Sequence, residues 1–143
     1  PPNPLLERGV RALQARGVIV VAAVGNDGPA APPQYPASYP GVIAVTGVDG
    51  HDHVLIEAGK ARHLDFAAPG ADMVAAVPGG KWERVRGTSF AAPLVAGRLA
   101  LADHGDAGAA IAAVAAHARP GRDVGRGIVC EPCRTPPREM GLK

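Results

Sequence analysis

One stretch of the chain, residues 86–97, limits the fold more than any other. It reads Arg-Gly-Thr-Ser-Phe-Ala-Ala-Pro-Leu-Val-Ala-Gly, and beyond it only Arg98 and Asp103 carry charge before the next histidine. The pattern predicts a helix that is apolar nearly all round and therefore lies in the middle of a domain. Thr88 and Ser89 would form its first turn, where backbone N–H groups lack partners and can help to hold an oxyanion.

Taken by composition alone, this stretch also fits a capped core helix in which Ser89 has no chemical role. The whole string, however, closely resembles the nucleophile motif of the subtilisin-like serine peptidases, one of the more specific serine-peptidase signatures. The resemblance implies that Ser89 is the nucleophile. Phe90 stands where many members of the family carry methionine.

The N-terminal third indicates an α/β arrangement. Asn3 and Pro4 are typical of a helix N-cap and first helical position, and Gly17 is typical of a helix end. Val18–Val24 is a continuous apolar and mostly β-branched run, which predicts a strand buried on both faces of a parallel sheet. Gly41–Val48 predicts a second buried strand.

Further along the chain, Met73–Val77 and Lys81–Val85 read as a hairpin, a helix follows Asp106, and Gly125–Val129 resembles the last small strand of the family. The expected fold class is therefore α/β: a three-layer, mostly parallel sheet with flanking helices, subtilisin-like, with the N-terminal half missing.

Asn26 follows the first expected strand, at the carboxyl edge of the sheet, where open α/β folds place their sites. By itself it is either a turn asparagine between glycines or an amide donor suited to an oxyanion. The segment Ala-Val-Gly-Asn-Asp-Gly is similar to the family segment in which the asparagine donates to the tetrahedral intermediate. The resemblance also implies substrate contacts at Gly25, Asp27, Gln34 and Thr88.

Two of these positions concern the primary specificity pocket. Asp27 would lie near its rim, where it would mildly favour basic side chains of the substrate or be no more than an exposed turn residue. Gln34 occupies the floor position, where glycine is frequent in the family, so the pocket here would be shallower. Tyr35-Pro36 matches a position where the family often has a cis peptide bond. Ser38, the other serine, is interpreted as structural.

The family pattern also requires an aspartate within Asp-(Ser/Thr)-Gly and a histidine within His-Gly-Thr, both before the serine. Neither motif occurs in the sequence. The sequence has five histidines, and none of them matches the family position for the base: they are His51, His53, His63, His104 and His117. We therefore expect residues 1–129 to be the C-terminal half of a subtilisin-like peptidase domain and residues 130–143 to be a flexible tail that contains a CxxC motif.

Cys130 and Cys133 form that motif. A zinc site would need further ligands that the chain does not supply, and a thioredoxin-type motif would need a strand–helix setting, which leaves a local disulfide or two free thiols. His51 and His53 read as solvated loop residues rather than metal ligands. We expect no metal site and no cofactor, although members of the family often bind structural calcium.

Charge and composition exclude several partners. The net charge is +2, from 15 basic and 13 acidic residues, so neither nucleic acid nor an anionic membrane is indicated. No apolar run reaches the length of a membrane span. Since only 3% of the residues are aromatic, the core must consist of Ala, Val, Leu and Ile.

Two functions remain. The chain is the nucleophile and oxyanion half of a serine endopeptidase that works through an acyl-enzyme, inactive by itself, or it is a catalytically silent remnant or a peptide- or protein-binding module. The first function implies a peptide or protein substrate and an N-terminal half that supplies the catalytic Asp and His. The resemblance further implies a secreted or periplasmic location.

Overall fold

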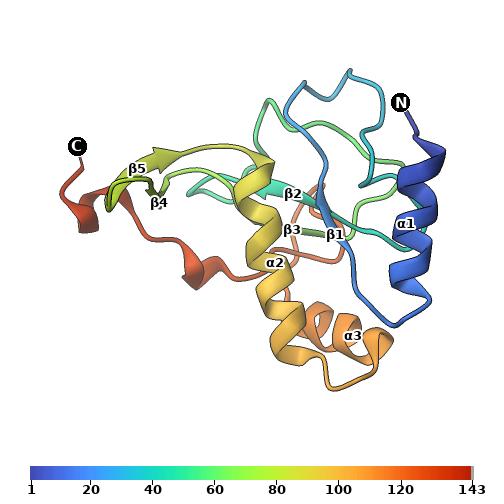
Figure 1. The fold of residues 1–143 in the computed structure, drawn as a ribbon. Coiled ribbons are helices and arrows are strands. Elements are labelled where there is room, and N and C mark those ends of the chain that lie inside the picture. Colours follow the sequence, from blue (N-terminus) through green and yellow to red (C-terminus); the bar gives the residue numbers. More distant parts are fainter. Residues whose placement is uncertain (143) are drawn as a thin grey trace.

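The computed structural model of the chain describes residues 1–142, apart from the side chain of Glu131. The elements, labelled in Figure 1, follow in the order α1 (Pro4–Gln14), β1 (Val21–Ala23), β2 (Ile43–Val48), β3 (Phe66–Pro69), β4 (Met73–Val77), β5 (Lys81–Val85), α2 (Thr88–Ala102), α3 (Ala107–His117), η1 (Glu131–Cys133) and η2 (Pro137–Met140). None of the described helices is long and apolar enough to cross a bilayer.

The strands form two sheets. β1, β2 and β3 are parallel and adjacent in that order, with Val21 opposite Ile43 and Val45 opposite Phe66. β4 and β5 form an antiparallel hairpin that extends away from the parallel sheet, beside the C-terminal segment (Figure 1). The expected α/β class and the expected hairpin are therefore both confirmed.

The side chains of β2 explain why the fold has three layers. Successive side chains of a strand point to opposite faces. Ile43 and Val45 pack in one cluster with Val95 and Leu99 of α2. Ala44, on the opposite face, packs in a second cluster that contains Val10 of α1. Because α2 covers one face and α1 together with neighbouring loops covers the other, every residue of β2 is buried.

The caps of α1 and α3 were both readable from the sequence. The Asn3 Oδ1 accepts hydrogen bonds from the backbone N–H groups of Leu5 and Leu6, at 3.0 and 3.1 Å, and Pro4 is the first helical residue. Asp106 caps α3 in the same way through the N–H of Ala109. Both are ordinary N-caps, in which a short polar side chain satisfies orphan donors.

The first strand is shorter and less buried than we predicted. β1 spans only Val21–Ala23, and Val18 is 44% exposed. The physical reason is its position at the sheet edge, since in the described part of the chain β1 pairs with β2 alone. The predicted strand over Val18–Val24 is therefore too long, and the prediction of full burial is wrong for Val18, whereas Ile19 and Val20 are partly buried against the two clusters.

The burial of α2 also differs from expectation. Thr88, Ala91, Val95 and Leu99 form its buried stripe, which faces the sheet. Leu101, in contrast, is 73% exposed. An apolar helix that we placed in the middle of a domain thus has cover on one side only, because within residues 1–142 it packs on the parallel sheet and on α3.

The segment after the last helix lies against the rest of the fold. Ile128 forms bridges with Ala67 and Arg119, which places the expected last strand beside β3. Further on, the guanidinium of Arg134 donates to backbone carbonyls, and the N–H of Val74 donates to the carbonyl of Thr135 at 3.0 Å. The division into a domain over residues 1–129 and a flexible tail over 130–143 stays a prediction.

The open side of β1 leads to a prediction about association. Val20 and Val24 bond to β2, so Val21 directs its backbone N–H and C=O to the unpaired edge. Flat apolar edges of this kind pair with other chains. The 143-residue chain should therefore self-associate with rising concentration in size-exclusion chromatography. Val21→Pro removes the outward donor, together with a side chain that is partly buried against the core, and should shift the chain toward monomer.

Ile56→Lys is the matched control, since it removes an apolar side chain that is 87% exposed without touching the edge. Circular dichroism establishes that both variants are folded. A chain that elutes as a monomer at every concentration would contradict the prediction, and so would dissociation by the Ile56 change alone.

Candidate active site

The side chain of Asn26 is bound to the start of α2. Its Oδ1 accepts a hydrogen bond from the backbone N–H of Thr88 at 2.9 Å, across 62 residues of sequence. The Thr88 hydroxyl donates in turn to the carbonyl of Gly25 at 3.2 Å, and Thr88 is fully buried. The two strings singled out in the sequence therefore meet at one place, directly before Ser89.

Main-chain hydrogen bonds hold the neighbouring loops around this contact. The N–H of Gly59 donates to the carbonyl of Gly25 at 2.8 Å, and the N–H of Gly28 donates to the carbonyl of Glu57 at 2.9 Å. On the other side, the N–H of Gly87 donates to the carbonyl of Gly70 at 2.8 Å. The loop that carries Asn26 and the turn that precedes α2 are thus each fixed to a second loop.

Two glycines are required by this close approach. A Cβ at Gly59 would lie 2.6 Å from the carbonyl oxygen of Val24. Gly87 has a φ of 142°, and a Cβ there would lie 3.2 Å from the Nδ2 of Asn26. A side chain at Gly59 would push loop 55–59 away from the end of β1, and one at Gly87 would push Asn26 away from the start of α2.

Ser89 lies in the first turn of α2 and is exposed. Among the residues that the structure describes, its hydroxyl has no hydrogen-bond partner, so no histidine contacts it as a base would. His63 is bonded through Nε2 to the carbonyl of Val42, and His117 through Nδ1 to that of Ala113. The arrangement contains a helix-terminal serine and an amide, without an acid–base pair.

The substrate positions inferred from the resemblance lie around the same contact. Gln34 packs against Gly25, where an added Cβ would lie 2.9 Å from the Gln34 Cγ. Asp27 is exposed. Ser38 is buried and accepts a hydrogen bond from the N–H of Arg62, which fits the structural role predicted for it. The Tyr35-Pro36 peptide bond is cis.

An ion pair that the sequence did not reveal lies beside the nucleophile turn. The Arg86 guanidinium contacts the carboxylate of Glu57, with Nε–Oε1 and Nη2–Oε2 distances of 2.6 and 2.8 Å. The hydrogen bonds from Arg86 hold the pKa of Glu57 below its usual value, and Glu57 raises the pKa of Arg86. The pair joins loop 55–59 to the turn that precedes α2. Because Glu57 and Arg86 are 29 residues apart, no local sequence pattern indicates that they form an ion pair.

The loop that holds His51 and His53 forms a turn around a carboxylate. Asp49 accepts hydrogen bonds from the N–H groups of His51 and His53, at 2.8 and 3.0 Å. Burial alone would raise the pKa of Asp49, but these two bonds and the nearby imidazoles outweigh it and lower the pKa. In the described part of the chain no three His, Cys, Asp or Glu side chains come together as metal ligands would.

Comparison with known proteins extends the likeness over most of the chain. A family model described as Peptidase_S8, the subtilase family, matches residues 5–119. Subtilisin BL of Lederbergia lenta is 39% identical over 100 residues, which are 70% of this chain and 37% of the relative. A thermophilic serine proteinase of Bacillus sp. (strain AK1) is 41% identical over 96 residues, which are 67% of this chain and 24% of the relative.

The solved structures agree in fold. The self-cleaved protease domain of PatA superposes with a TM-score of 0.78 at 31% identity, covering 92% of this chain and 54% of that one. The chain thus spans 37% and 24% of the length of the two curated relatives and about half of this structure. Since the family model covers most of the sequence and the fold agrees, the chain belongs to the subtilase family of serine proteases.

Proposed function

We propose that the chain is the nucleophile and oxyanion half of a serine endopeptidase that cleaves peptide bonds through an acyl-enzyme. Ser89 is the nucleophile and Asn26 the side-chain oxyanion donor. The observation that supports this most directly is the 2.9 Å bond between the Asn26 Oδ1 and the N–H of Thr88. It places the asparagine beside the turn that carries the serine and leaves the Nδ2 group of Asn26 to donate elsewhere.

In this mechanism the Ser89 Oγ attacks the carbonyl carbon of the substrate. The oxygen of that carbonyl becomes an oxyanion, which the Asn26 Nδ2 and the backbone N–H of Ser89 stabilise. A base, which this proposal takes from an N-terminal half, accepts the proton of the Ser89 hydroxyl during the attack and gives it to the leaving nitrogen when the tetrahedral intermediate collapses. The C–N bond breaks, the amine half of the substrate is released, and water then hydrolyses the acyl-serine and restores the Ser89 hydroxyl. The N-terminal end of α2 favours the negative charge, because its dipole and its free N–H groups face it.

Direct substrate contacts in the proposal come from Gly25, Asp27 and Gln34. Thr88, which is fully buried, acts through its hydrogen bonds to Asn26 and Gly25. Gln34 lies against Gly25, which supports a shallow primary pocket closed by the amide side chain. Asp27 at the rim supports a mild preference for basic side chains. The substrate is a peptide or protein, and the resemblance supports a secreted or periplasmic location.

The proposal requires a base and an orienting acid that residues 1–142 do not place at Ser89. A serine hydroxyl is a weak nucleophile without an adjacent base. We therefore propose that an N-terminal half of the family type supplies both groups. The exposed side of α2 and the open edge of β1 support this, because both are surfaces that such a half would cover. The alternative is a catalytically silent chain that at most binds a peptide or a partner protein.

A prediction about turnover separates these cases. The 143-residue chain alone should not turn over peptide esters or amides at a peptidase-like rate, and Ser89→Ala should leave its residual rate unchanged. Without a base, only the roughly 10³–10⁴-fold acceleration over water from an oxyanion hole and binding remains. Adding the N-terminal half of a subtilase, with its Asp and His, should restore turnover to the wild-type chain and not to Ser89→Ala.

Two outcomes would count against this account. Robust turnover by the lone chain that disappears in Ser89→Ala would mean that one of its own histidines acts as the base. A stoichiometric complex between the two halves that stays inactive would favour the catalytically silent alternative.

A further prediction concerns Asn26 in the reconstituted enzyme. Asn26→Asp keeps the acceptor for the N–H of Thr88 but removes the amide donor, so the local fold should persist while kcat falls and KM changes little. We expect a loss on the order of 10²–10³-fold, which is the size established for the oxyanion asparagine of subtilisin rather than a figure calculated for this chain.

Asn3→Asp is the matched control, because it makes the same chemical change at a helix cap that also uses only the Oδ1 atom. Its kcat should equal that of the unaltered enzyme. Equal kcat values for Asn26→Asp and Asn3→Asp would remove Asn26 from the mechanism.

A further inference from the structure

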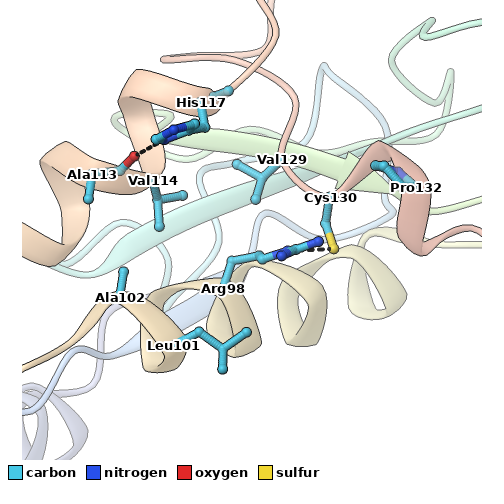
Figure 2. A pocket seen from close by; sticks show the side chains of 10 residues that line it. Arg98, Leu101, Ala102, Ala113, Val114, His117, Val129, Cys130 and Pro132 are labelled. Atoms are coloured by element: carbon cyan, nitrogen blue, oxygen red, sulfur yellow. Dashed lines mark hydrogen bonds between the residues drawn. The ribbon is translucent and has the colours of Figure 1, made fainter.

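Arg98 is the only charged residue of α2, and its partners are sulfur atoms. Cys130 and Cys133 are joined by a disulfide, one of the two alternatives that the sequence left open. The Arg98 Nε donates to the Sγ of Cys130 at 3.1 Å, and its Nη2 donates to the Sγ of Cys133 at 3.7 Å. No carboxylate pairs with Arg98 in the part of the chain that the structure describes. Figure 2 shows the guanidinium directed at Cys130.

A pocket of about 470 Å³ opens beside these sulfurs, between α2, α3 and the CxxC segment. Its walls are mostly apolar, and Arg98 and His117 are the charged or titratable side chains among its lining residues (Figure 2). His117 is bonded back to the carbonyl of Ala113 on its own helix. Cys130 lines the pocket, whereas Cys133 lies outside its lining and is half-buried, so that its sulfur is approached from solvent.

The charge of Arg98 affects the two redox states differently. A disulfide is neutral and gains little from a guanidinium, whereas a thiolate at the same distance is stabilised by it. In thioredoxin-like proteins the N-terminus of a long helix contributes to this effect. Here η1 is a single turn, so the strand–helix setting is absent as the sequence indicated, and Arg98 supplies the positive charge instead.

We propose that Cys130 and Cys133 form a thiol–disulfide exchange site that is reduced by a small dithiol from solvent, with Arg98 stabilising the thiolate of Cys130. One thiolate of the reductant attacks the Sγ of Cys133, the bond between the two protein sulfurs breaks, and Cys130 leaves as a thiolate beside Arg98. The second thiol of the reductant then attacks the mixed disulfide and frees Cys133.

The exchange is balanced without another reagent. The dithiol gives up two electrons and two protons and becomes a cyclic disulfide, and the protein gains two thiols. Cys130 is the better leaving group because its Sγ is the nearer of the two to the guanidinium, and a leaving thiol that is more readily ionised leaves faster.

The test measures how alkylation of the Cys130 thiol depends on pH. In a Cys133→Ser chain, iodoacetamide labelling followed by mass spectrometry should be half-maximal at least about one pH unit below the value of about 8.5 for a free cysteine. Arg98→Gln in the same chain should move the midpoint back toward that value and slow labelling near neutral pH about tenfold. Arg98→Lys, which keeps the charge, should retain most of the effect.

His117→Gln is the matched control for the other titratable group at the pocket, and it should leave the labelling profile unchanged. Repeating the measurement in concentrated guanidinium chloride keeps the proposal testable if a variant folds poorly, because unfolding should abolish the shift. Identical profiles for the native and denatured Cys133→Ser chain would overturn the proposal. So would a shift that persists in Arg98→Gln and disappears in His117→Gln.

Discussion

The hydrogen bond from the N–H of Thr88 to the side chain of Asn26 is the contact on which the site depends. It satisfies a donor in the first turn of α2 that would otherwise be orphaned, and it takes the place of an ordinary N-cap, because Gly87 has no side chain to provide one. The rest of the fold holds its two ends in place. β1 delivers Asn26, and the buried stripe of α2 seats the helix on the parallel sheet.

The same contact explains why the surrounding loops are rich in glycine. Backbone segments approach one another so closely at Gly59, Gly70 and Gly87 that a Cβ would meet a neighbouring backbone or side-chain atom. The Glu57–Arg86 ion pair adds a charged tie between two of these loops at the surface. Because exposed ion pairs contribute little to stability, we interpret it as fixing the position of a loop rather than holding the fold together.

Much of this was predictable from the sequence where local chemistry decides. The Asn3 and Asp106 caps, the buried run of β2 and the hairpin follow from short-range patterns. Ser89 and Asn26 were identified because each lies in a string that resembles the family. The short extent and partial burial of β1 and the uncovered side of α2 were not predictable, because the burial of a strand or helix depends on what packs against it. The Arg98 contact with the two cysteines joins residues more than 30 positions apart, and no local pattern signals it.

The central claim is that Asn26 and the first turn of α2 face one common oxygen. A crystal structure of the chain, assembled with an N-terminal half and phosphonylated at Ser89 by a peptidyl phosphonofluoridate, tests it most directly. We predict that the phosphoryl oxygen lies about 2.7–3.1 Å from both the Asn26 Nδ2 and the backbone N of Ser89. A phosphoryl oxygen directed to solvent, with the Asn26 amide turned away from it, would contradict the account.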